Sequence, residues 1–306
     1  MRRLGILFFI CFLTSVTFAE NTQKIQQEKK QFINKLVKKD HFQLAKLDEL
    51  LLPIKPNQKL IQAMNKPFEK KPWIFYRDFF ITPERIILGA QYLKKHHRVL
   101  MVMQKKYGIP ASIITAIIGV ETEYGMHLGK YSVLNALYTL GFYYPPREKF
   151  FRKELAQYLI LTRDNHLNPK TIKGSYAGAL GIPQFMPSSY RHYSVSYDNN
   201  KFVNLFHNND AIASVAYYFH QNGWKPNQPI THLTNQAHGK NIIALSLGKS
   251  MQYWKIDPNF HVIMSYNHNV VYAMVVYQLS RAIEKQYALD LSRKTKSHHL
   301  APQRSA

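Results

Sequence analysis

The sequence predicts a mainly α-helical protein that carries a small β element. Apolar residues recur at helical spacing through most of the chain between residues 20 and 222. Prolines, glycines and capping hydroxyls stand where these segments begin and end. Residues 225–256 differ, because they are interrupted by Pro, Asn and Gly and hold two short runs typical of strands, 242–247 and 252–255. The fold class is therefore mainly α with a minor β insertion.

The composition allows a folded core and favours an anionic partner. Of the 306 residues, 46% are hydrophobic and 19% are charged, which excludes a wholly disordered chain. The 41 Lys and Arg against 18 Asp and Glu give a net charge of +23 with His neutral. A field of this sign favours nucleic acid, an acidic membrane surface or another anionic polymer. The single cysteine excludes a disulfide framework and a Cys-rich zinc site.

The first nineteen residues are typical of a secretory signal peptide. Arg2 and Arg3 precede an apolar run at residues 4–13, and a small-residue cleavage pattern ends at Ala19. The run is short for a membrane span, although an uncleaved N-terminal anchor is the alternative. Cys11 lacks the small neighbours of a lipoprotein site, which argues against lipidation. Export of the chain argues against a nucleic-acid partner.

The N-terminal half is expected to hold three helical segments. Residues 20–50 carry an apolar stripe that predicts an amphipathic helix, and prolines from Pro53 onward mark an irregular stretch. A second helix begins at residues 82–84, where a capping hydroxyl, a proline and an acid follow one another, and it runs to Gly108. Residues 112–124 have no polar face, so we expect a helix that is buried on all sides.

Helical patterns also fill the C-terminal half. They occupy residues 146–165, 187–194 and 209–222, another helix begins at Asp257-Pro258, and a long final one spans residues 270–287. The basic end of the chain is expected to be disordered.

The chemistry points to Glu121, which ends the buried helix. Ile117 and Ile118 lie one turn back, so we expect the carboxyl to be desolvated, and it faces the negative end of the helix dipole. Both effects disfavour the charged form and raise the pKa, as a general acid needs near neutral pH. The alternative is an ordinary acid at a fraying helix end. Glu123 projects about 200° further around the helix and is expected to be a surface charge.

Two further clusters fit either ligand binding or ordinary packing. Residues 173–190 include three glycines within eight residues, which permit close approach of a ligand or of another helix. Tyr266, Asn267 and Tyr272 combine ring faces with an amide, a set that suits sugar binding and is equally common at the edge of a core. Neither cluster decides the function by itself.

Taken together, in this order and spacing, the clusters resemble the membrane-bound lytic murein transglycosylase B family. The motifs that carry the resemblance are Glu121-Thr122-Glu123-Tyr124-Gly125, the stretch 174–190 from Gly174-Ser175-Tyr176 to Ser188-Ser189-Tyr190, and Tyr266-Asn267-His268. Shorter matches are Asn135-Ala136-Leu137, Tyr144-Pro145-Pro146-Arg147 and Asn222-Gly223-Trp224. The resemblance runs from about residue 80 to residue 285.

The resemblance implies a goose-lysozyme-like core with a helical flanking domain and a small β insertion. The domain ranges expected on this basis are 1–19 for the signal peptide, 20–102 for the N-terminal helical domain, 103–224 for the first part of the catalytic core, 225–256 for the β insertion, 257–290 for completion of the core with the C-terminal helix, and 291–306 for a basic disordered tail.

The resemblance also implies an activity. The family cleaves the β-1,4 bond between N-acetylmuramic acid and N-acetylglucosamine in peptidoglycan without water, because the muramyl C6 hydroxyl closes on C1. Glu121 would protonate the leaving oxygen and then accept the hydroxyl proton, with no cofactor required. We expect a periplasmic monomer that binds glycan strands and associates peripherally with the cell wall or membrane. The alternatives are a hydrolytic muramidase of the same fold and a non-catalytic, cationic peptidoglycan-binding scaffold protein.

The family's pattern also suggests which residues contact the substrate. Six positions fall where such contacts lie, namely Ser175, Gln184, Tyr218, Tyr266, Asn267 and Tyr272. Arg147 matches one of a pair of arginines near the peptide or lactyl carboxylates of the substrate. Pro146 stands where the other arginine would be, so we expect a weaker grip there.

Members of the family carry a calcium loop that would follow the helix at Tyr190. The corresponding residues here are weak metal candidates, namely Ser196, Asp198, Asn200 and Asp210. Calcium affinity rises with the number of acidic ligands, and Lys201 adds a positive charge among them. Because Asn tolerates left-handed backbone angles, we expect Asn199 and Asn200 to keep the turn without tight calcium binding.

Overall fold

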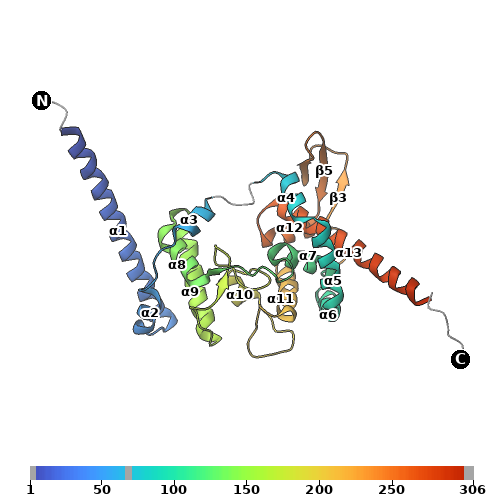
Figure 1. Ribbon diagram of the computed structural model, residues 1–306, viewed down its shortest axis with the longest axis horizontal. Coiled ribbons are helices and arrows are strands. Elements are labelled where there is room, and N and C mark those ends of the chain that lie inside the picture. The colour runs from blue at the N-terminus through green and yellow to red at the C-terminus, as the bar shows by residue number, and fades with distance from the viewer. Residues whose placement is uncertain (1–4, 66–70, 300–306) are drawn as a thin grey trace. The chain divides into compact units, whose positions relative to one another are not determined.

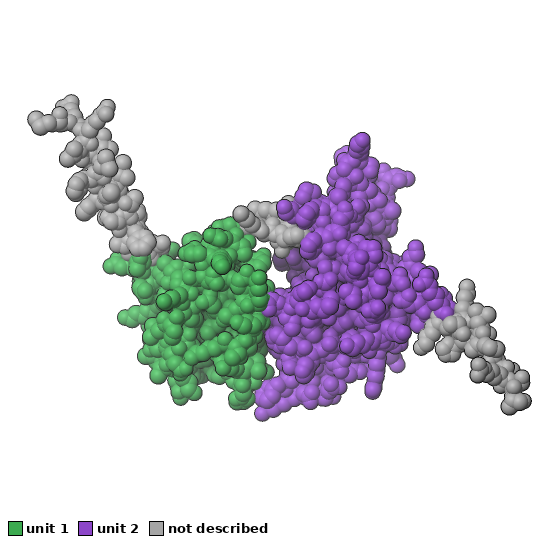
Figure 2. Space-filling model, in the orientation of Figure 1, with its two compact units in different colours: residues 1–66, 130–179 green, residues 67–129, 180–306 purple. Residues whose placement is uncertain are grey.

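The computed structural model describes residues 5–65 and 71–299, and the side chains of residues 22–65 and 71–293. Two compact units divide the chain, and each combines two separate stretches (Figure 2). The first unit comprises Met1–Lys66 and Lys130–Ala179, and the second comprises Pro67–Gly129 and Leu180–Ala306. The fold is mainly helical with small sheets, as the sequence predicts (Figure 1).

The first unit is a set of helices with one very short sheet. Its helices are α1 (Gly5–Asp40), α2 (Leu44–Leu51), α3 (Gln58–Met64), α8 (Val133–Tyr143), the 3₁₀ turn η2 (Pro145–Arg147) and α9 (Glu148–Asp164). Two-residue strands, β1 (Tyr131–Ser132) and β2 (Lys173–Gly174), pair antiparallel. The helices α8 and α9 pack against each other, and Phe32 of α1 meets Phe142 of α8 edge to face at 5.7 Å.

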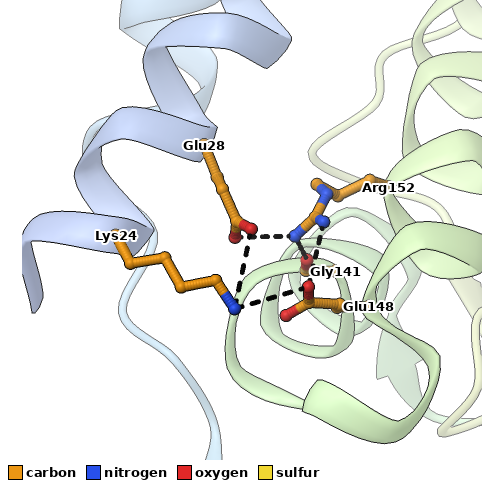
Figure 3. Close-up of polar contacts among 5 residues, drawn as sticks. All are labelled: Lys24, Glu28, Gly141, Glu148 and Arg152. Atoms are coloured by element: carbon orange, nitrogen blue, oxygen red, sulfur yellow. Dashed lines mark hydrogen bonds and ion pairs between the residues drawn. The ribbon is translucent and has the colours of Figure 1, made fainter. Parts of the chain in front are cut away.

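A guanidinium group fastens α1 to the rest of the first unit (Figure 3). Arg152 of α9 donates to the carboxylate of Glu28 in α1 over 2.9 Å and to the carbonyl of Gly141 in α8 over 2.9 Å. It also donates to Glu148 over 3.2 Å. The side chains of Arg152, Glu28 and Glu148 are only 15%, 18% and 14% exposed, so solvent and salt screen these ion pairs less than surface pairs.

The second unit is built around α7 (Ala111–Thr122). This helix contacts α5 (Pro83–Lys95), α6 (His97–Tyr107), α11 (Asn208–Gln221) and α13 (Val270–His299). The remaining helices are α4 (Trp73–Phe80), α10 (Pro187–Tyr193) and α12 (Pro258–Tyr266). Ile114, Ile117 and Ile118 have no exposed surface, which confirms the prediction of a helix buried on all sides. At a transfer free energy of roughly 1.5–3 kcal/mol for each large apolar side chain, α7 is a principal source of stability in this unit.

The predicted β insertion forms a three-stranded antiparallel sheet. Its strands β3 (Thr231–Thr234), β4 (Ile242–Ser246) and β5 (Met251–Ile256) are ordered β3-β5-β4. The positions of β4 and β5 confirm the two predicted strand-like runs. The sequence did not indicate β3, because its four residues follow a Pro-rich segment and alternate too briefly to form a pattern. Trp254 of β5 packs edge to face against Tyr277 of α13 at 6.1 Å, which attaches the sheet to the helices.

Several helices differ from the sequence-based prediction. The helix expected from residue 83 to Gly108 is interrupted at His96, whose backbone angles (φ −104°, ψ 20°) are not helical. Within the stretch expected to be irregular, α3 and α4 form, and α8 was also not predicted. These helices are short or apolar on nearly every side, so their sequences carry little periodicity.

The expected disordered tail is wrong over its first part. Residues 291–299 continue α13 to His299, because the segment contains good helix formers and the first proline after residue 270 is Pro302. Residues 300–306 lie outside the described part of the chain.

The expected signal segment, residues 1–19, falls on the start of α1 from Gly5, with Met1–Leu4 and the side chains of the whole segment outside those described. No helix in the described part of the chain has both the length and the apolar character that a membrane crossing requires. The expected domain ranges remain a prediction. The two compact units do not follow them, since they divide the chain near residues 66, 129 and 179.

Candidate active site

Glu121 occupies the last turn of α7, in the second unit. The side chain is half-buried, and its Oε1 accepts a hydrogen bond of 2.6 Å from the hydroxyl of Tyr272. Tyr272 lies near the start of α13 and is 2% exposed. The sequence of α7 has no polar face, so the helix is buried, and the packing of α13 against it brings these two side chains together. The arrangement holds one carboxyl in a fixed orientation at the edge of the core.

Two stacked tyrosines form one side of the site. The rings of Tyr266 and Tyr272 are nearly parallel, at an interplanar angle of 10° and a centroid distance of 6.4 Å. The hydroxyl of Tyr266 donates to the carbonyl of Pro183 over 2.6 Å. Burial, and next the negative charge of Glu121, raise the pKa of both tyrosines well above the usual value. Both hydroxyls therefore remain protonated and act as hydrogen-bond donors at neutral pH.

Tyr218 lies behind Tyr266 in an aromatic cluster. It is 8% exposed, and its hydroxyl donates to the carbonyl of Ser265 over 2.7 Å. The rings of Phe185, Tyr193 and Tyr266 surround it at centroid distances of 5.7, 4.7 and 5.0 Å. Burial raises the pKa of Tyr218 as well. Close packing of these rings fixes the orientation of Tyr266 and limits its movement.

The glycine-rich segment continues into a tight loop beside Glu121. Gly181 has φ 69°, and an added Cβ would lie 2.7 Å from the carbonyl oxygen of Leu205, so only glycine fits. Gln184 has φ 50°, and its Nε2 donates to the carbonyl oxygens of Gly181 and Leu128 over 2.8 and 3.3 Å. Thr122 donates through Oγ1 to the carbonyl of Ile182 over 2.9 Å. The loop is thereby tied to the residue that follows Glu121.

A left-handed turn ends α7 immediately after the site. Glu123 and Tyr124 have φ 50° and 63°, a backbone conformation that costs on the order of 1–3 kcal/mol per residue unless its surroundings hold it. Tyr124 donates through its hydroxyl to the carbonyl of Arg85 over 2.7 Å. Its ring fits only because Gly119 has no Cβ, since an added one would lie 2.7 Å away.

Arg85 of α5 secures the same turn from the other side. It is 9% exposed, and its Nη1 donates to the carbonyl of Gly119 over 2.9 Å near the C-terminal end of α7. Its Nη2 lies 3.8 Å from Oε1 of Glu123, whose other oxygen is 3.0 Å from Nε2 of His127. The expectation that Glu123 is a surface charge is therefore wrong, because the carboxylate is partly buried and paired. The sequence analysis did not identify Arg85 as a site residue. Its only signal there is a positive charge one turn before Gly89, on a helix face that is otherwise apolar.

Asn267 ends α12 in an extended conformation (φ −142°, ψ 116°), directly after Tyr266. The two remaining predicted substrate contacts belong to the first unit. Ser175 Oγ accepts hydrogen bonds from the backbone N–H of Ala177 and of Ala179, over 3.3 and 3.0 Å. Arg147 is exposed, and its guanidinium lies 4.3 Å from the centroid of the Phe150 ring. In the second unit, therefore, Tyr272 contacts Glu121, Tyr266 stacks on Tyr272, and Tyr218 packs against Tyr266. Gln184 bonds to the carbonyls of its own loop and of Leu128, and Ser175 and Arg147 are described within the first unit.

The predicted metal loop is organised by hydrogen bonds within the chain. Asp210 is 6% exposed, and its two carboxylate oxygens accept from the backbone N–H of Tyr197 and of Asn204 over 2.9 and 2.8 Å. Ser196 Oγ accepts from the N–H of Asn200 over 2.8 Å, and Asp198 is exposed.

Asn199 has φ 56°, as expected for the turn. Within the described ranges, no cluster of three or more His, Cys, Asp or Glu side chains could hold a metal ion. One carboxylate already bonded to two N–H groups and one exposed acid fit a tight calcium site poorly.

Comparison with known proteins identifies relatives. Residues 24–245 match the family described as Transglycosylase SLT domain. The chain is 35% identical over 294 residues to membrane-bound lytic murein transglycosylase B of Escherichia coli (strain K12), covering 83% of this chain and 81% of that protein.

Two solved structures extend the likeness to the fold. One is the E. coli lytic transglycosylase Slt35 in complex with calcium, at a TM-score of 0.80 and 34% identity over 85% of this chain and 93% of that one. The other is the soluble lytic transglycosylase SltB1 from Pseudomonas aeruginosa, at a TM-score of 0.79 and 37% identity, over 84% of this chain and 98% of that one. The fold is therefore that of the lytic transglycosylases, with a lysozyme-like core, as the sequence resemblance implied.

Proposed function

Because the chain belongs to the Transglycosylase SLT domain family and is a peptidoglycan lytic transglycosylase, we propose that Glu121 is its general acid and base. The observation that carries this assignment is the hydrogen bond of 2.6 Å from Tyr272, which holds the carboxyl at the end of a buried helix. A positioned carboxyl is what proton transfer to and from a sugar oxygen requires. Glu123, the nearest other acid in the sequence, is paired with Arg85 and His127 instead.

The proposed reaction uses one carboxyl twice. Glu121 gives its proton to the glycosidic oxygen as the bond from C1 of the muramyl residue breaks, and it becomes a carboxylate. The C6 hydroxyl of the same sugar then forms a bond to C1 and loses its proton to Glu121. No water is consumed, and the enzyme returns to its starting protonation state with a 1,6-anhydromuramyl end as product.

The residues around Glu121 divide into two groups in this proposal. Tyr272 holds the carboxyl from within the core, so we assign it a positioning role in place of the substrate contact expected from the sequence. Tyr266, Asn267 and Gln184 remain proposed substrate contacts, with Tyr218 supporting Tyr266 from behind. Ser175 and Arg147 also remain proposed substrate contacts.

Analysis of the products released from purified peptidoglycan sacculi tests the function. Mass spectrometry should find muropeptides with 1,6-anhydromuramyl ends, which lack one water relative to reducing ends. Reducing ends in place of anhydro ends would identify a hydrolytic muramidase. A protein that binds sacculi and releases nothing would be a scaffold protein.

We also infer that the chain acts in the periplasm after removal of residues 1–19. Arg2, Arg3 and the apolar run at residues 4–13 support this inference, and so does a substrate that lies outside the cytoplasmic membrane. Fractionation of cells should find the chain in the periplasm, N-terminal sequencing should give Glu20 as its first residue, and size-exclusion chromatography should give the size of a monomer. A chain that keeps Met1 in the membrane fraction would show instead that the segment is retained as an anchor.

A further inference from the structure

A groove of about 470 Å³ runs between α1 and α9 in the first unit. Its apolar floor includes Phe32, Leu36 and Ile160, which are all buried. Its walls carry four exposed lysines, namely Lys35, Lys39, Lys149 and Lys153. We call this site the lysine groove. The only acid that lines the groove is Asp40, so the four cations are in excess.

The charge of the lysine groove is not neutralised by the protein itself. Arg152 also lines the groove, but its guanidinium already donates hydrogen bonds to Glu28, Glu148 and the Gly141 carbonyl (Figure 3). None of the four lysines has an ion-pair partner among the side chains that the structure describes. A concave surface with low-dielectric walls focuses such a field and raises the local concentration of anions.

The spacing of the lysines brings like charges together. Lys35 and Lys39 lie one turn apart on α1, and Lys149 and Lys153 lie one turn apart on α9. Like charges at this spacing destabilise a helix, and here two such pairs line one groove. A bound anion would relieve this repulsion.

The walls of the groove are held in place without any ligand. The Arg152 network joins α1 to α8 and α9, and Lys29 of α1 donates to the hydroxyl of Tyr143 over 3.0 Å. Phe32 packs edge to face on Phe142. A preformed site binds with a smaller entropic penalty than one that must be ordered by its ligand.

We propose that the lysine groove binds the carboxylates of the stem peptides of peptidoglycan, as a contact additional to the cleavage site. The proposal rests on the proposed function, since it takes the ligand from the same polymer. Stem peptides are flexible chains that carry free carboxylates, and a chain can enter a groove between two helices. A flat lipid surface would meet the rims and leave the floor empty. The ammonium groups of lysine suit carboxylates presented in variable geometry, because each acts as a point charge.

Sedimentation of sacculi with the mature chain, which begins at Glu20, tests the proposal. All variants carry Glu121→Gln, so that the polymer is not digested during the measurement. The groove variant replaces the four groove lysines by Gln. The control variant makes the same charge change at four exposed lysines of the first unit outside the groove: Lys30, Lys38, Lys55 and Lys59. Neither variant should melt at a lower temperature than the parent, because all eight side chains are exposed and the groove variant also loses its two like-charged pairs.

The groove variant should bind sacculi roughly tenfold more weakly than the control variant and with a smaller dependence on salt. Equal affinity of the two variants would overturn the proposal.

A second comparison uses sacculi from which an amidase has removed the stem peptides. The groove variant and its parent should bind these sacculi equally well, and a persisting difference would exclude the peptides as ligand. Vesicles of anionic phospholipid provide the last comparison. A loss of vesicle binding, with sacculus binding kept, would assign the groove to the membrane.

The sedimentation result is independent of the reaction chemistry. If product analysis found no anhydro ends, the proposed function would fail while the binding comparison would still stand. If both variants bound sacculi equally while anhydro ends were formed, the lysine groove alone would be rejected.

Discussion

The hydroxyl of Tyr272 in α13 donates a hydrogen bond of 2.6 Å to Oε1 of Glu121 in α7, although the two residues are 151 positions apart in the chain. The tyrosine is buried, and its raised pKa keeps the proton on the hydroxyl. The donor therefore comes from the core, while the substrate must approach from the exposed side of the carboxyl. This arrangement separates the group that holds the acid from the groups that hold the sugar.

Replacement of Glu121 tests the acid directly. Glu121→Gln keeps the shape of the side chain and removes the transferable proton, so turnover of sacculi should fall by about 10²–10⁴ or more. Binding of sacculi by sedimentation should persist. Digestion at close to the wild-type rate would show that another group is the acid.

Tyr272→Phe removes the donor to Glu121 while it keeps the ring. Turnover should fall by about tenfold to a hundredfold, because small displacements of a catalytic group are costly. The Michaelis constant should change little, since the tyrosine lies behind the acid. Tyr158→Phe is a matched control, because this buried tyrosine donates to the carbonyl of Pro169 in the first unit. Similar kinetic losses in both variants would mean that Tyr272 acts only through stability.

Arg85 should matter for the site without touching it. Arg85→Met removes the donor to the Gly119 carbonyl and the partner of Glu123, and it should cost roughly 1.5–3 kcal/mol of stability. The rate constant for turnover should fall more than substrate affinity, because the turn after Glu121 loosens. Arg85→Lys should restore part of both losses. The control is Arg77→Met, at an arginine whose exposed pair with Asp78 contributes about 0–1 kcal/mol. Kinetics unchanged in Arg85→Met would limit the residue to a structural role.

Alkaline pH should unfold this protein through its buried tyrosines. The pKa values of Tyr92, Tyr124, Tyr158, Tyr266 and Tyr272 are raised by burial. The folded state keeps these protons while the unfolded chain loses them from about pH 10, so the stabilisation is complete below pH 10 and is lost as the pH rises further. Melting temperatures between neutral pH and pH 11 should fall steeply above pH 10, together with a rise in tyrosinate absorbance. A flat profile across that range would contradict the raised pKa values.

Calcium should stabilise the chain very little. Asp210 already accepts two backbone N–H groups, so millimolar calcium should raise the melting temperature by less than about a degree or two. Asp210→Asn should instead cost roughly 1–3 kcal/mol, because one acceptor is lost at a buried position. The E. coli relative has been solved with calcium, which makes the comparison informative. A clear calcium-dependent rise that Asp198→Ala abolishes would establish a metal site here.

Local patterns predicted much of the second unit correctly. The apolar run of α7 required burial whatever surrounded it, and the cap at Thr82 marked the start of α5, where Thr82 accepts from the N–H of Arg85. The left-handed Asn199 and the strands β4 and β5 also followed from residue type and spacing. Each of these features depends on residues within one or two turns of one another.

The sequence by itself determined that α7 has no polar face and that Glu121 lies at its end. Only the tertiary structure decided that Tyr272 donates a hydrogen bond to Glu121, that Glu123 pairs with Arg85, and that Asp210 accepts hydrogen bonds from backbone N–H groups of its loop. Periodicity reports how one element is buried, because it arises from neighbours along the chain. The partner of a buried polar group depends on which distant element packs against it, and a hydrogen bond forms only within a few tenths of an ångström of the right separation.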